Sequence, residues 1–584
     1  MSKNKFIAAT ILLFGSMTLT AQNMLNYTIE IIKPETHYAK VKISTKAQDD
    51  QLHFVMPSWT PGSYLMREFA KSVDRVKAKI NDIEIPVTKT DKGTWQVTGV
   101  KGKKVDFEYD VYAFELSVRT SFIDEDQAFL HNTSIFMLVE EQKNEAGSIS
   151  IVKPETWRTI STSLKKDGQK FLFSDYDDLG DSPIQIGNHE VFNFEVRGVP
   201  HEVAMVGIHN ADIKKLKNDM QRICEIMTDI VDEHPCEKYV FFVQNVESGG
   251  GGLEHKNSCT VMMPRWSYTN SGKYNSFLGL VAHEYFHLWN VKRIRPAALG
   301  PFDYKNENYT NLLWVAEGIT SYYDELAMYT FGYRDKNSYL SQLASYVTRV
   351  ENTPGTYVQT LSESSWDAWL KSYRPNENSS NTGISYYSKG LVVAMLLDAE
   401  IIGATLGKKN LNDLMQFLYK EYAVKLNRGF TDLEFQQAVN KVAGKNLDAF
   451  MDKYVYGLDM PAYSEIMRKV NVDVSIENRL NQTIGLRTKI ENGRTIVSSI
   501  NSKSVAYSAG INVNDEIIAV NGVRINNDVD EVVSTQSQKN GINILLNRSG
   551  LIKTINLDYA PINEINVIMK TGTPSKTQIS FFRD

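Results

Sequence analysis

Cysteine is scarce in this 584-residue chain, which has three, at Cys224, Cys236 and Cys259. So small a number excludes a framework of several disulfides, and a single bridge would leave one thiol free. No Cys-x-x-Cys pair occurs. We therefore assign the cysteines no metal-binding or redox role.

An excess of positive charge is also missing. The chain has 64 Lys and Arg against 69 Asp and Glu, a formal net charge of −5, and no block of basic residues. Nucleic-acid binding is therefore disfavoured. With 42% hydrophobic and 23% charged residues the composition is globular, and the length suggests about three or four domains.

Long hydrophobic runs are absent after the amino-terminal segment, residues 1–21. That segment has the pattern of a signal peptide, because Lys3 and Lys5 precede an apolar stretch, residues 6–19, that is too short for a membrane span. We expect cleavage after Ala21 and export to the periplasm or the medium, with no later transmembrane segment. An uncleaved anchor is the alternative.

Histidine is sparse, with ten in the chain, yet His283-Glu284-x-x-His287 places two of them four residues apart in an apolar, helix-forming stretch. On a helix, residues i and i+4 share a face, so His283 and His287 can bind one metal ion. Glu284 lies beside them and can accept a proton from the attacking water. The alternative is two core histidines that share a helix face by chance.

A third ligand is expected from a second apolar segment, Trp314–Tyr323, in which Glu317 is the acid near the start. Two histidines and a glutamate form the ligand set of thermolysin-like enzymes and leave a fourth position for water. This predicts one Zn²⁺ per chain. Ser321 or Asp324 is a candidate to orient the ligands from behind. A solvated Glu317 is the alternative.

These motifs resemble a known family. Residues 283–296 resemble the signature of the glycyl aminopeptidase family of zinc metallopeptidases, of the gluzincin type, and residues 314–323 resemble its third-ligand helix. That family is similar to aminopeptidase N in its catalytic domain and often carries a PDZ domain. The resemblance implies a zinc-dependent aminopeptidase that uses zinc-activated water to remove the N-terminal residue of a peptide, with a preference for Gly or Ala.

A glycine-rich stretch ends in a second resemblance. Gly252-Leu253-Glu254-His255 is similar to the Gly-x-Met-Glu-Asn motif of aminopeptidase N enzymes. The resemblance implies that Glu254 binds the free amino group of the substrate, while the strand with Gly251, Gly252 and Leu253 pairs with the peptide backbone. His255 departs from the Asn of that motif, so its role stays open. A flexible loop with a solvated glutamate is the alternative.

Tyr386-Tyr387-Ser388-Lys389-Gly390 resembles the Tyr-x-Lys-Gly motif of the same enzymes. By position, Tyr387 is the residue whose hydroxyl would stabilise the oxyanion. Tyr386 is its neighbour in the motif. For either tyrosine taken alone, core packing is the alternative.

Two further segments are left with open interpretations. Lys292, Arg293 and Arg295 end the metal-binding segment, where they suit the helix dipole or bind a substrate carboxylate. Residues 57–69 resemble a segment shared within the family. For them we favour a rigid Pro/Gly turn over a loop that faces the substrate.

The predicted fold is α+β and multidomain. Alternating strands indicate a β-sandwich-like domain over residues 22–200, followed by a mostly helical, thermolysin-like domain over 201–468. Residues 469–560 resemble a bacterial PDZ domain, in which Ile484, Gly485 and Leu486 would bind the carboxylate of a peptide C-terminus added as a strand. Residues 561–584 form a C-terminal tail of unknown structure, which fits no domain that the sequence indicates.

Two alternative functions remain open. One is a zinc endopeptidase, or another zinc hydrolase on the same scaffold, in which the glycine-rich stretch binds no amine. The other is a PDZ-based binding protein with a vestigial metal site.

Overall fold

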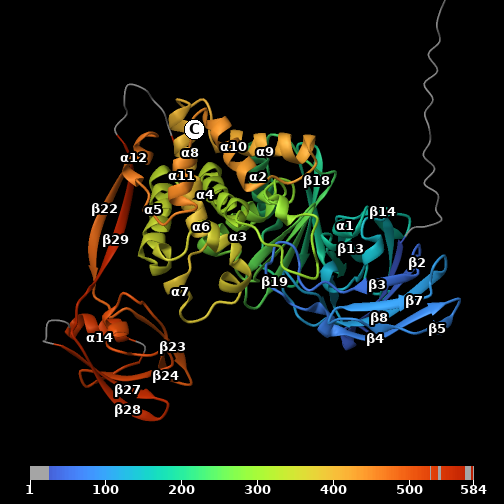
Figure 1. The fold of residues 1–584 in the computed structure, drawn as a ribbon, viewed down its shortest axis with the longest axis horizontal. Helices are drawn as coiled ribbons and strands as arrows, with labels where there is room; N and C mark the ends of the chain where they lie inside the picture. Colours follow the sequence, from blue (N-terminus) through green and yellow to red (C-terminus); the bar gives the residue numbers. More distant parts are fainter. Residues whose placement is uncertain (1–24, 527, 537–540, 573–580, 583–584) are drawn as a thin grey trace, which may run out of the picture.

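The computed structural model describes residues 25–526, 528–536, 541–572 and 581–582. The expected signal peptide lies outside these residues, so export stays a prediction. Along the chain the structure has an N-terminal β domain, a mostly helical middle domain and a small C-terminal domain (Figure 1). The predicted α+β multidomain fold is confirmed.

The N-terminal domain is a sandwich of sheets. Along β8 every second residue is buried, and Phe107 of this strand stacks on Phe54 of β3 with 3.8 Å between ring centroids. The largest sheet has the order β14 (Lys165–Asp167), β15 (Lys170–Phe173), β12 (Gly147–Val152), β1 (Leu25–Glu30), β2 (Tyr38–Lys46), β8 (Lys104–Tyr112), β4 (Val73–Ile80), β5 (Ile83–Ile85). Two four-stranded sheets follow the orders β13 (Thr159–Thr162), β16 (Ile184–Gly187), β10 (Gln127–Leu130), β9 (Phe122–Ile123) and β11 (Leu138–Val139), β3 (Gln51–Val55), β7 (Thr94–Thr98), β6 (Thr88–Lys89). A short helix, α1 (Tyr176–Gly180), completes the domain.

A mixed five-stranded sheet opens the middle domain. Its order is β17 (Glu190–Val196), β18 (Val199–Val206), β19 (Tyr239–Val246), β21 (Ser258–Pro264), β20 (Gly251–His255). Strand β17 pairs with β18 from Glu190 opposite Met205 to Val196 opposite Val199. The domain boundary expected near residue 200 is therefore wrong by one strand, because β17 belongs to this second sheet.

Helices surround this sheet and share one large apolar core with it (Figure 1). They are α2 (Ile213–Val231), α3 (Ser271–Phe286), the π-helix η6 (Trp314–Gly318), α4 (Ile319–Phe331), α5 (Lys336–Asn352), α6 (Leu361–Trp366), α7 (Ser379–Thr382), α8 (Ser388–Ala404), α9 (Leu411–Leu418), α10 (Asp432–Ala443), α11 (Asp448–Tyr454) and α12 (Tyr463–Arg468). Helix α3 stops at Phe286, and irregular turns carry the chain on to residue 294. The expectation of one helix up to Pro296 was therefore too long.

A two-stranded ribbon leads to the C-terminal domain and back. Strand β22 (Val472–Asn481) pairs antiparallel with β29 (Ile562–Thr571), and β29 is hydrogen-bonded to α5, where Asn352 bonds both backbone groups of Ile565. Neither strand belongs to the PDZ sheet, which starts at β23. The predicted PDZ region, residues 469–560, thus includes β22 of the ribbon, and the predicted C-terminal tail, residues 561–584, contains β29.

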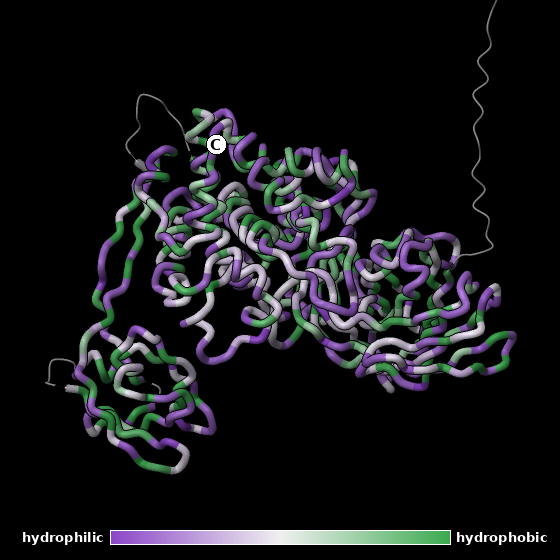
Figure 2. Tube along the Cα trace, in the orientation of Figure 1, coloured by the Kyte–Doolittle hydropathy of each residue, from purple (hydrophilic) through white to green (hydrophobic). Residues whose placement is uncertain are grey.

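The PDZ domain has its own small core. Its elements are β23 (Leu486–Glu491), β24 (Arg494–Ile500), α13 (Val505–Ser508), β25 (Glu516–Val520), β26 (Val523–Arg524), α14 (Val529–Gln536), β27 (Ile542–Arg548) and β28 (Leu551–Leu557). In each part of the chain, hydrophobic and hydrophilic residues are interspersed (Figure 2). Among the described residues, no helix combines the length and apolar character needed to cross a bilayer. All three cysteines are free thiols.

Candidate metal centre and active site

Helix α3 presents two of the three predicted ligands. The side chain of Asn270 caps its first turn by accepting a hydrogen bond from the backbone of Lys273 at 3.0 Å. His283 lies in the last turn and His287 follows the last helical residue. Their imidazole rings are 4.7 Å apart. The spacing of four residues thus brings the two rings together, as the sequence predicts.

Glu317 comes from the π-helix η6 and meets both histidines. Its Oε2 lies 3.4 Å from His283 Nε2 and 3.3 Å from His287 Nε2. The same carboxylate oxygen is buried and makes no hydrogen bond among the described residues. Four atoms placed tetrahedrally about 2.0–2.2 Å from zinc would lie about 3.4 Å from one another. The three side chains therefore fit a zinc ion.

The charge state of Glu317 suits a metal ligand. Burial alone would raise the pKa of its carboxyl, but the neighbouring His287 and His283 lower this pKa to about 2. A carboxylate with this pKa is ionised at neutral pH. It needs a cation beside it, because an isolated buried charge is costly.

Both histidines are held in orientation by a hydrogen bond of the ring nitrogen Nδ1. His283 Nδ1 donates to Asp324 Oδ2 at 2.8 Å, and His287 Nδ1 donates to the backbone oxygen of Asn290 at 2.6 Å. These acceptors leave each Nε2 free to bind a metal. Of the two candidates Ser321 and Asp324, Asp324 is the one that contacts a ligand.

Asn290 connects the two ligand-bearing elements, and sequence reasoning missed it. Its side-chain amide donates to the backbone oxygens of Val315 at 2.8 Å and Ala316 at 3.1 Å. Its own backbone oxygen accepts from His287. One fully buried residue thus joins the His287 turn to the π-helix of Glu317. The sequence signal was a polar residue within an otherwise apolar run.

Two glutamates face each other beside this cluster. Glu284, from α3, and Glu254, from β20, are both almost completely buried. Their carboxylates and His287 form a second group of possible ligand atoms within 4.8 Å of one another. Burial raises the pKa of Glu284, and the Glu254 carboxylate acts in the same direction against the two histidines. A raised pKa suits a group that must accept and return a proton near neutral pH.

Strand β20 lies at the edge of its sheet, and its successive side chains point to opposite faces, so the predicted substrate-binding residues fall on two sides. Gly252 and Glu254 lie on the metal side, and a Cβ on Gly252 would fall 2.2 Å from Glu284. Leu253 packs in a separate apolar cluster with Val118 and Met262. Gly251 has a φ of 113°, a backbone angle that favours glycine. Only glycine at 252 therefore lets β20 approach the catalytic helix so closely.

His255 and Glu254 have different surroundings. His255 Nδ1 lies 3.1 Å from Asp181 Oδ1, so this residue ties β20 to the N-terminal domain. Glu254 Oε1 is buried and makes no hydrogen bond to any described residue. The departure from the Asn of the aminopeptidase N motif thus serves a contact between domains, while Glu254 keeps an unpartnered oxygen.

Tyr387 lies over a predicted metal ligand, His283, and Tyr386 lies in the core. The Tyr387 ring stacks over His283 with 6.3 Å between centroids and an interplanar angle of 23°. Tyr386 is fully buried. Of the pair, Tyr387 also lines the active-site cleft.

The cleft has a volume of about 700 Å³ and runs along one side of the metal cluster. The described residues that line it include Arg119, Gly252, His283, Glu284, Asp324 and Tyr387. Arg119 belongs to the N-terminal domain and was not predicted. The residues next to Arg119 in the sequence form no motif, so nothing in the sequence singled it out.

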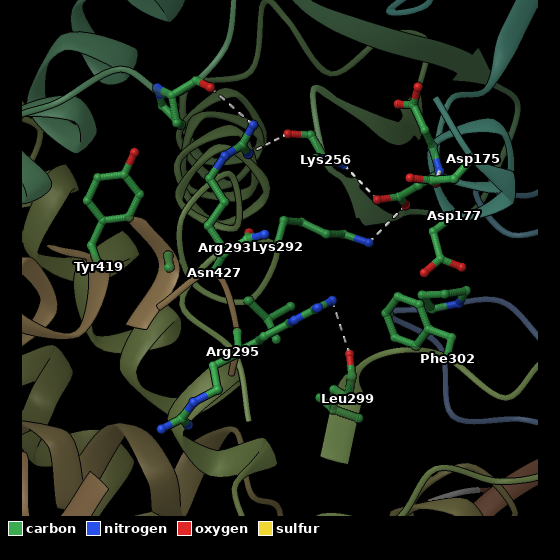
Figure 3. A pocket seen from close by; sticks show the side chains of 18 of the residues that line it. Asp175, Asp177, Lys256, Lys292, Arg293, Arg295, Leu299, Phe302, Tyr419 and Asn427 are labelled. Carbon is green, nitrogen blue, oxygen red and sulfur yellow. Dashed lines mark hydrogen bonds and ion pairs between the residues drawn. The ribbon is translucent and has the colours of Figure 1, made fainter. Parts of the chain in front are cut away.

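The basic residues after the metal motif face another pocket (Figure 3). Lys292 pairs with Asp181 at 2.9 Å, and Arg293 donates to Asn257 Oδ1 at 2.8 Å and to the backbone of Lys256 at 2.7 Å. Arg295 reaches the backbone oxygen of Leu299. None of the described lining residues of this 380 Å³ pocket is a predicted metal ligand. These contacts tie the turn between β20 and β21 to the middle and N-terminal domains.

Residues 57–69 form a loop that reaches the active site. A Cβ on Gly62 would fall 2.5 Å from Glu254 Oε1, and its φ of 88° favours glycine. Tyr64, from the same loop, packs edge-on against Trp369 and Tyr373. The loop lies against Glu254, as the alternative of a loop that faces the substrate expects, and its rigidity stays a prediction.

The predicted peptide-binding residues of the PDZ domain lie at the start of an edge strand. Leu486 begins β23, which is paired on one side with β24. Gly485 has a φ of 80°, and Ile562 of β29 packs against it. Ile484 is fully buried in the PDZ core. Peptide binding at this edge stays a prediction.

Fold and site together define a metallopeptidase of the type that binds its metal with a His-Glu-x-x-His helix and a later glutamate. Residues 26–188 match the Peptidase M61 N-terminal domain, residues 276–393 match M61 glycyl aminopeptidase, and residues 473–547 match the PDZ domain. Two of these matches, over residues 26–188 and 276–393, are to domains of the M61 glycyl aminopeptidases, which this chain therefore resembles.

Solved structures include a full-length relative. An aminopeptidase N family protein from Idiomarina loihiensis is 28% identical, with a TM-score of 0.88 over 96% of this chain and 100% of its own. An M1 zinc metallopeptidase from Deinococcus radiodurans is 12% identical, with a TM-score of 0.49 over 75% of this chain and 94% of its own. The comparison with curated proteins gives no match.

Proposed function

We propose that the protein is a zinc-dependent aminopeptidase that removes a small N-terminal residue, Gly or Ala, from peptides, with one zinc ion per chain. The observation that carries the proposal is the pairing of two features at one site. The ligand atoms of His283, His287 and Glu317 lie within 4.8 Å of one another. Beside His287 lies Glu254, which has a buried carboxylate oxygen without a hydrogen-bond partner among the described residues. The match of residues 276–393 to M61 glycyl aminopeptidase supports the activity and the small first residue.

His283, His287 and Glu317 would hold the zinc. When bound there, zinc supplies Lewis-acid chemistry, which lowers the pKa of water and polarises the scissile carbonyl. Glu284 is buried beside the ligands without being one of them. It accepts the proton of the attacking water and returns it to the leaving amine.

Tyr387 donates a hydrogen bond to the oxyanion. Its ring lies over His283 at the edge of the cleft, and burial raises the pKa of its hydroxyl well above the usual value. The phenol therefore stays protonated at neutral pH. A donor aimed at charge that develops only in the transition state lowers the barrier.

Glu254 binds the substrate ammonium. The free edge of β20 offers backbone groups to an extended peptide, as in strand addition. A peptide on this edge ends at Glu254, because the Gly62 loop blocks further extension. The closeness of that loop, with Tyr64 beside it, also supports a small first residue.

The test is a substrate screen on purified protein, with aminoacyl and N-acetylated aminoacyl reporters, before and after metal removal by a chelator and after zinc is restored. We expect hydrolysis of free-amine Gly and Ala substrates only, loss with the chelator and recovery with zinc. Equal cleavage of acetylated peptides would favour the endopeptidase alternative. Zinc-loaded protein without any hydrolysis would favour a PDZ-based binding protein.

A further inference from the structure

Among the described residues that line the active-site cleft, one arginine has no ion-pair partner. Of the two arginines that line it, Arg334 forms an ion pair with Glu325. Arg119 has no carboxylate within ion-pair distance among the described residues, and its Nε is buried without a hydrogen-bond partner. Lys292 and Arg293 differ from it: Lys292 pairs with Asp181, and Arg293 donates to the backbone oxygen of Lys256 (Figure 3). An arginine held in a cleft without a counter-ion is ready to bind an anion.

Arg119 reaches the cleft from the N-terminal domain and contacts the substrate-binding strand. Its Nη2 donates to the backbone oxygen of Gly252 at 3.2 Å. This bond uses one of the five N–H donors of the guanidinium. The remaining N–H groups of the planar guanidinium can bind a carboxylate through two parallel hydrogen bonds.

A second arginine strengthens the positive potential around Arg119. Arg67, also from the N-terminal domain, has no carboxylate within ion-pair distance in the described part of the chain, and its closest hydrogen bond is to the backbone of Leu65. Burial lowers its pKa to about 10, and the charge of Arg119 acts in the same direction, while Tyr373 and Glu115 act against them. Two like charges held together favour an anion between or beside them.

The spacing along β20 indicates which anion. Gly252, which Arg119 contacts, and Glu254, the proposed amine anchor, are two residues apart on one face of the strand. A strand rises about 3.3 Å per residue, so these positions are about 6.6 Å apart. The ammonium and the carboxylate of an extended dipeptide are separated by a similar length, because both are two residues of extended chain.

We propose that Arg119 binds the free α-carboxylate of a dipeptide substrate, which makes dipeptides the preferred substrate class of this site. The inference rests on the proposed function, in which Glu254 holds the other end. A tripeptide would carry its carboxylate about 3.3 Å further along the strand and lose this contact. Amidation of the carboxylate would remove the charge that the guanidinium recognises.

The first experiment compares Ala-Ala with Ala-Ala-amide as substrates of the wild type, Arg119→Gln and Arg334→Gln. Glutamine at 119 keeps an N–H donor for Gly252 but loses the charge, so a structural role of the side chain is retained. We expect the wild type to favour Ala-Ala by at least about tenfold in kcat/KM. Arg119→Gln should abolish the preference by slowing Ala-Ala. Arg334→Gln, the matched control in the same cleft, should leave the preference unchanged.

The second experiment measures binding without turnover. Calorimetry gives the Kd of Ala-Ala and Ala-Ala-amide for Glu284→Gln and for the double variant with Arg119→Gln. We expect Ala-Ala to bind Glu284→Gln at least about tenfold more tightly than the amide, and the double variant to bind both equally. A carboxylate-dependent Kd without turnover in the wild type would keep this inference and refute the aminopeptidase function.

Three results would overturn the inference. The wild type could hydrolyse acid and amide equally well, which would leave the aminopeptidase function intact. Arg119→Gln could slow both substrates by the same factor, which indicates a structural role. Absence of any measurable dipeptide binding by Glu284→Gln, with no turnover in the wild type, would refute both proposals.

Discussion

The metal cluster and the PDZ domain differ in how many contacts hold them in place. In the cluster, His283 and His287 are each fixed through the second ring nitrogen, and Asn290 ties their segment to the helix of Glu317. The PDZ domain has a core of its own. It contacts the middle domain through the β22–β29 ribbon and through two hydrogen bonds made by Asn381. In addition, the ammonium of Lys503 lies over the ring of Tyr357.

This difference predicts which substitutions should reduce turnover most. The cluster is built from buried groups that depend on one another, so removal of one leaves others unpaired and costly. The PDZ domain is attached by contacts that can be lost without exposing a core. Effects on turnover should therefore decrease from the ligands, through the groups that act on the substrate, to the PDZ contact.

The largest effect is expected from His287→Ala. It removes one of three ligands and leaves Glu317 with His283 alone, so bound metal should be lost. Turnover should fall by more than about 10³-fold, because the metal supplies several kcal/mol of transition-state stabilisation. Metal analysis by mass spectrometry and kinetics with excess zinc check this. A variant that retains stoichiometric zinc and activity would remove His287 from the site.

Glu284→Gln should separate metal binding from catalysis. Glutamine is nearly isosteric but cannot accept the proton, so zinc content should stay at the wild-type level while kcat falls by about 10²–10⁴-fold. Metal analysis and steady-state kinetics on the same preparation measure both. Turnover within tenfold of the wild type would rule out the general-base role.

Tyr387→Phe should retain zinc and slow turnover by about 10²-fold, because it removes one donor to the oxyanion. Tyr386→Phe is the matched control, since this neighbour is buried in the core. It should change thermal stability more than kcat. The reverse order of kcat values would show that Tyr386, and not Tyr387, faces the reacting carbonyl.

The smallest effect on turnover is expected from Asn381→Ala. Asn381 Nδ2 donates to Ile500 at 2.8 Å, and its Oδ1 accepts from Ser502 at 2.9 Å. Loss of two hydrogen bonds of about 1 kcal/mol each should weaken PDZ docking. Small-angle scattering should report a larger maximum dimension with dipeptide turnover nearly unchanged. A large fall in kcat would instead couple the PDZ domain to catalysis.

The predictable part of the site lies in short stretches of sequence. The geometry of His283, Glu284 and His287 follows from helical periodicity, and Glu317, Glu254 and Tyr387 could be found through motifs with a chemical reason. Asn290 and Arg119 could not. Each acts through contacts between residues distant in sequence, such as Arg119 with Gly252, and no local pattern encodes such a contact.

The fold was predictable to the level of its three parts but not to the assignment of each strand. Strand β17 alternates like the strands before it, and nothing in that pattern says which sheet it joins. Strand β29 is defined by pairing with β22 across the whole PDZ domain. Its structure therefore depends on a partner far away in the sequence.

The most direct test of the central claim is the position of the metal. The structure contains two possible ligand groups that share His287, one with His283 and Glu317 and one with Glu254 and Glu284. Anomalous scattering at the zinc edge from a crystal of the purified protein distinguishes them. The account predicts one peak per chain, about 2.0–2.2 Å from both Nε2 atoms and from a Glu317 oxygen. A peak between Glu254 and Glu284 would contradict it, because neither glutamate could then anchor the amine or accept the proton.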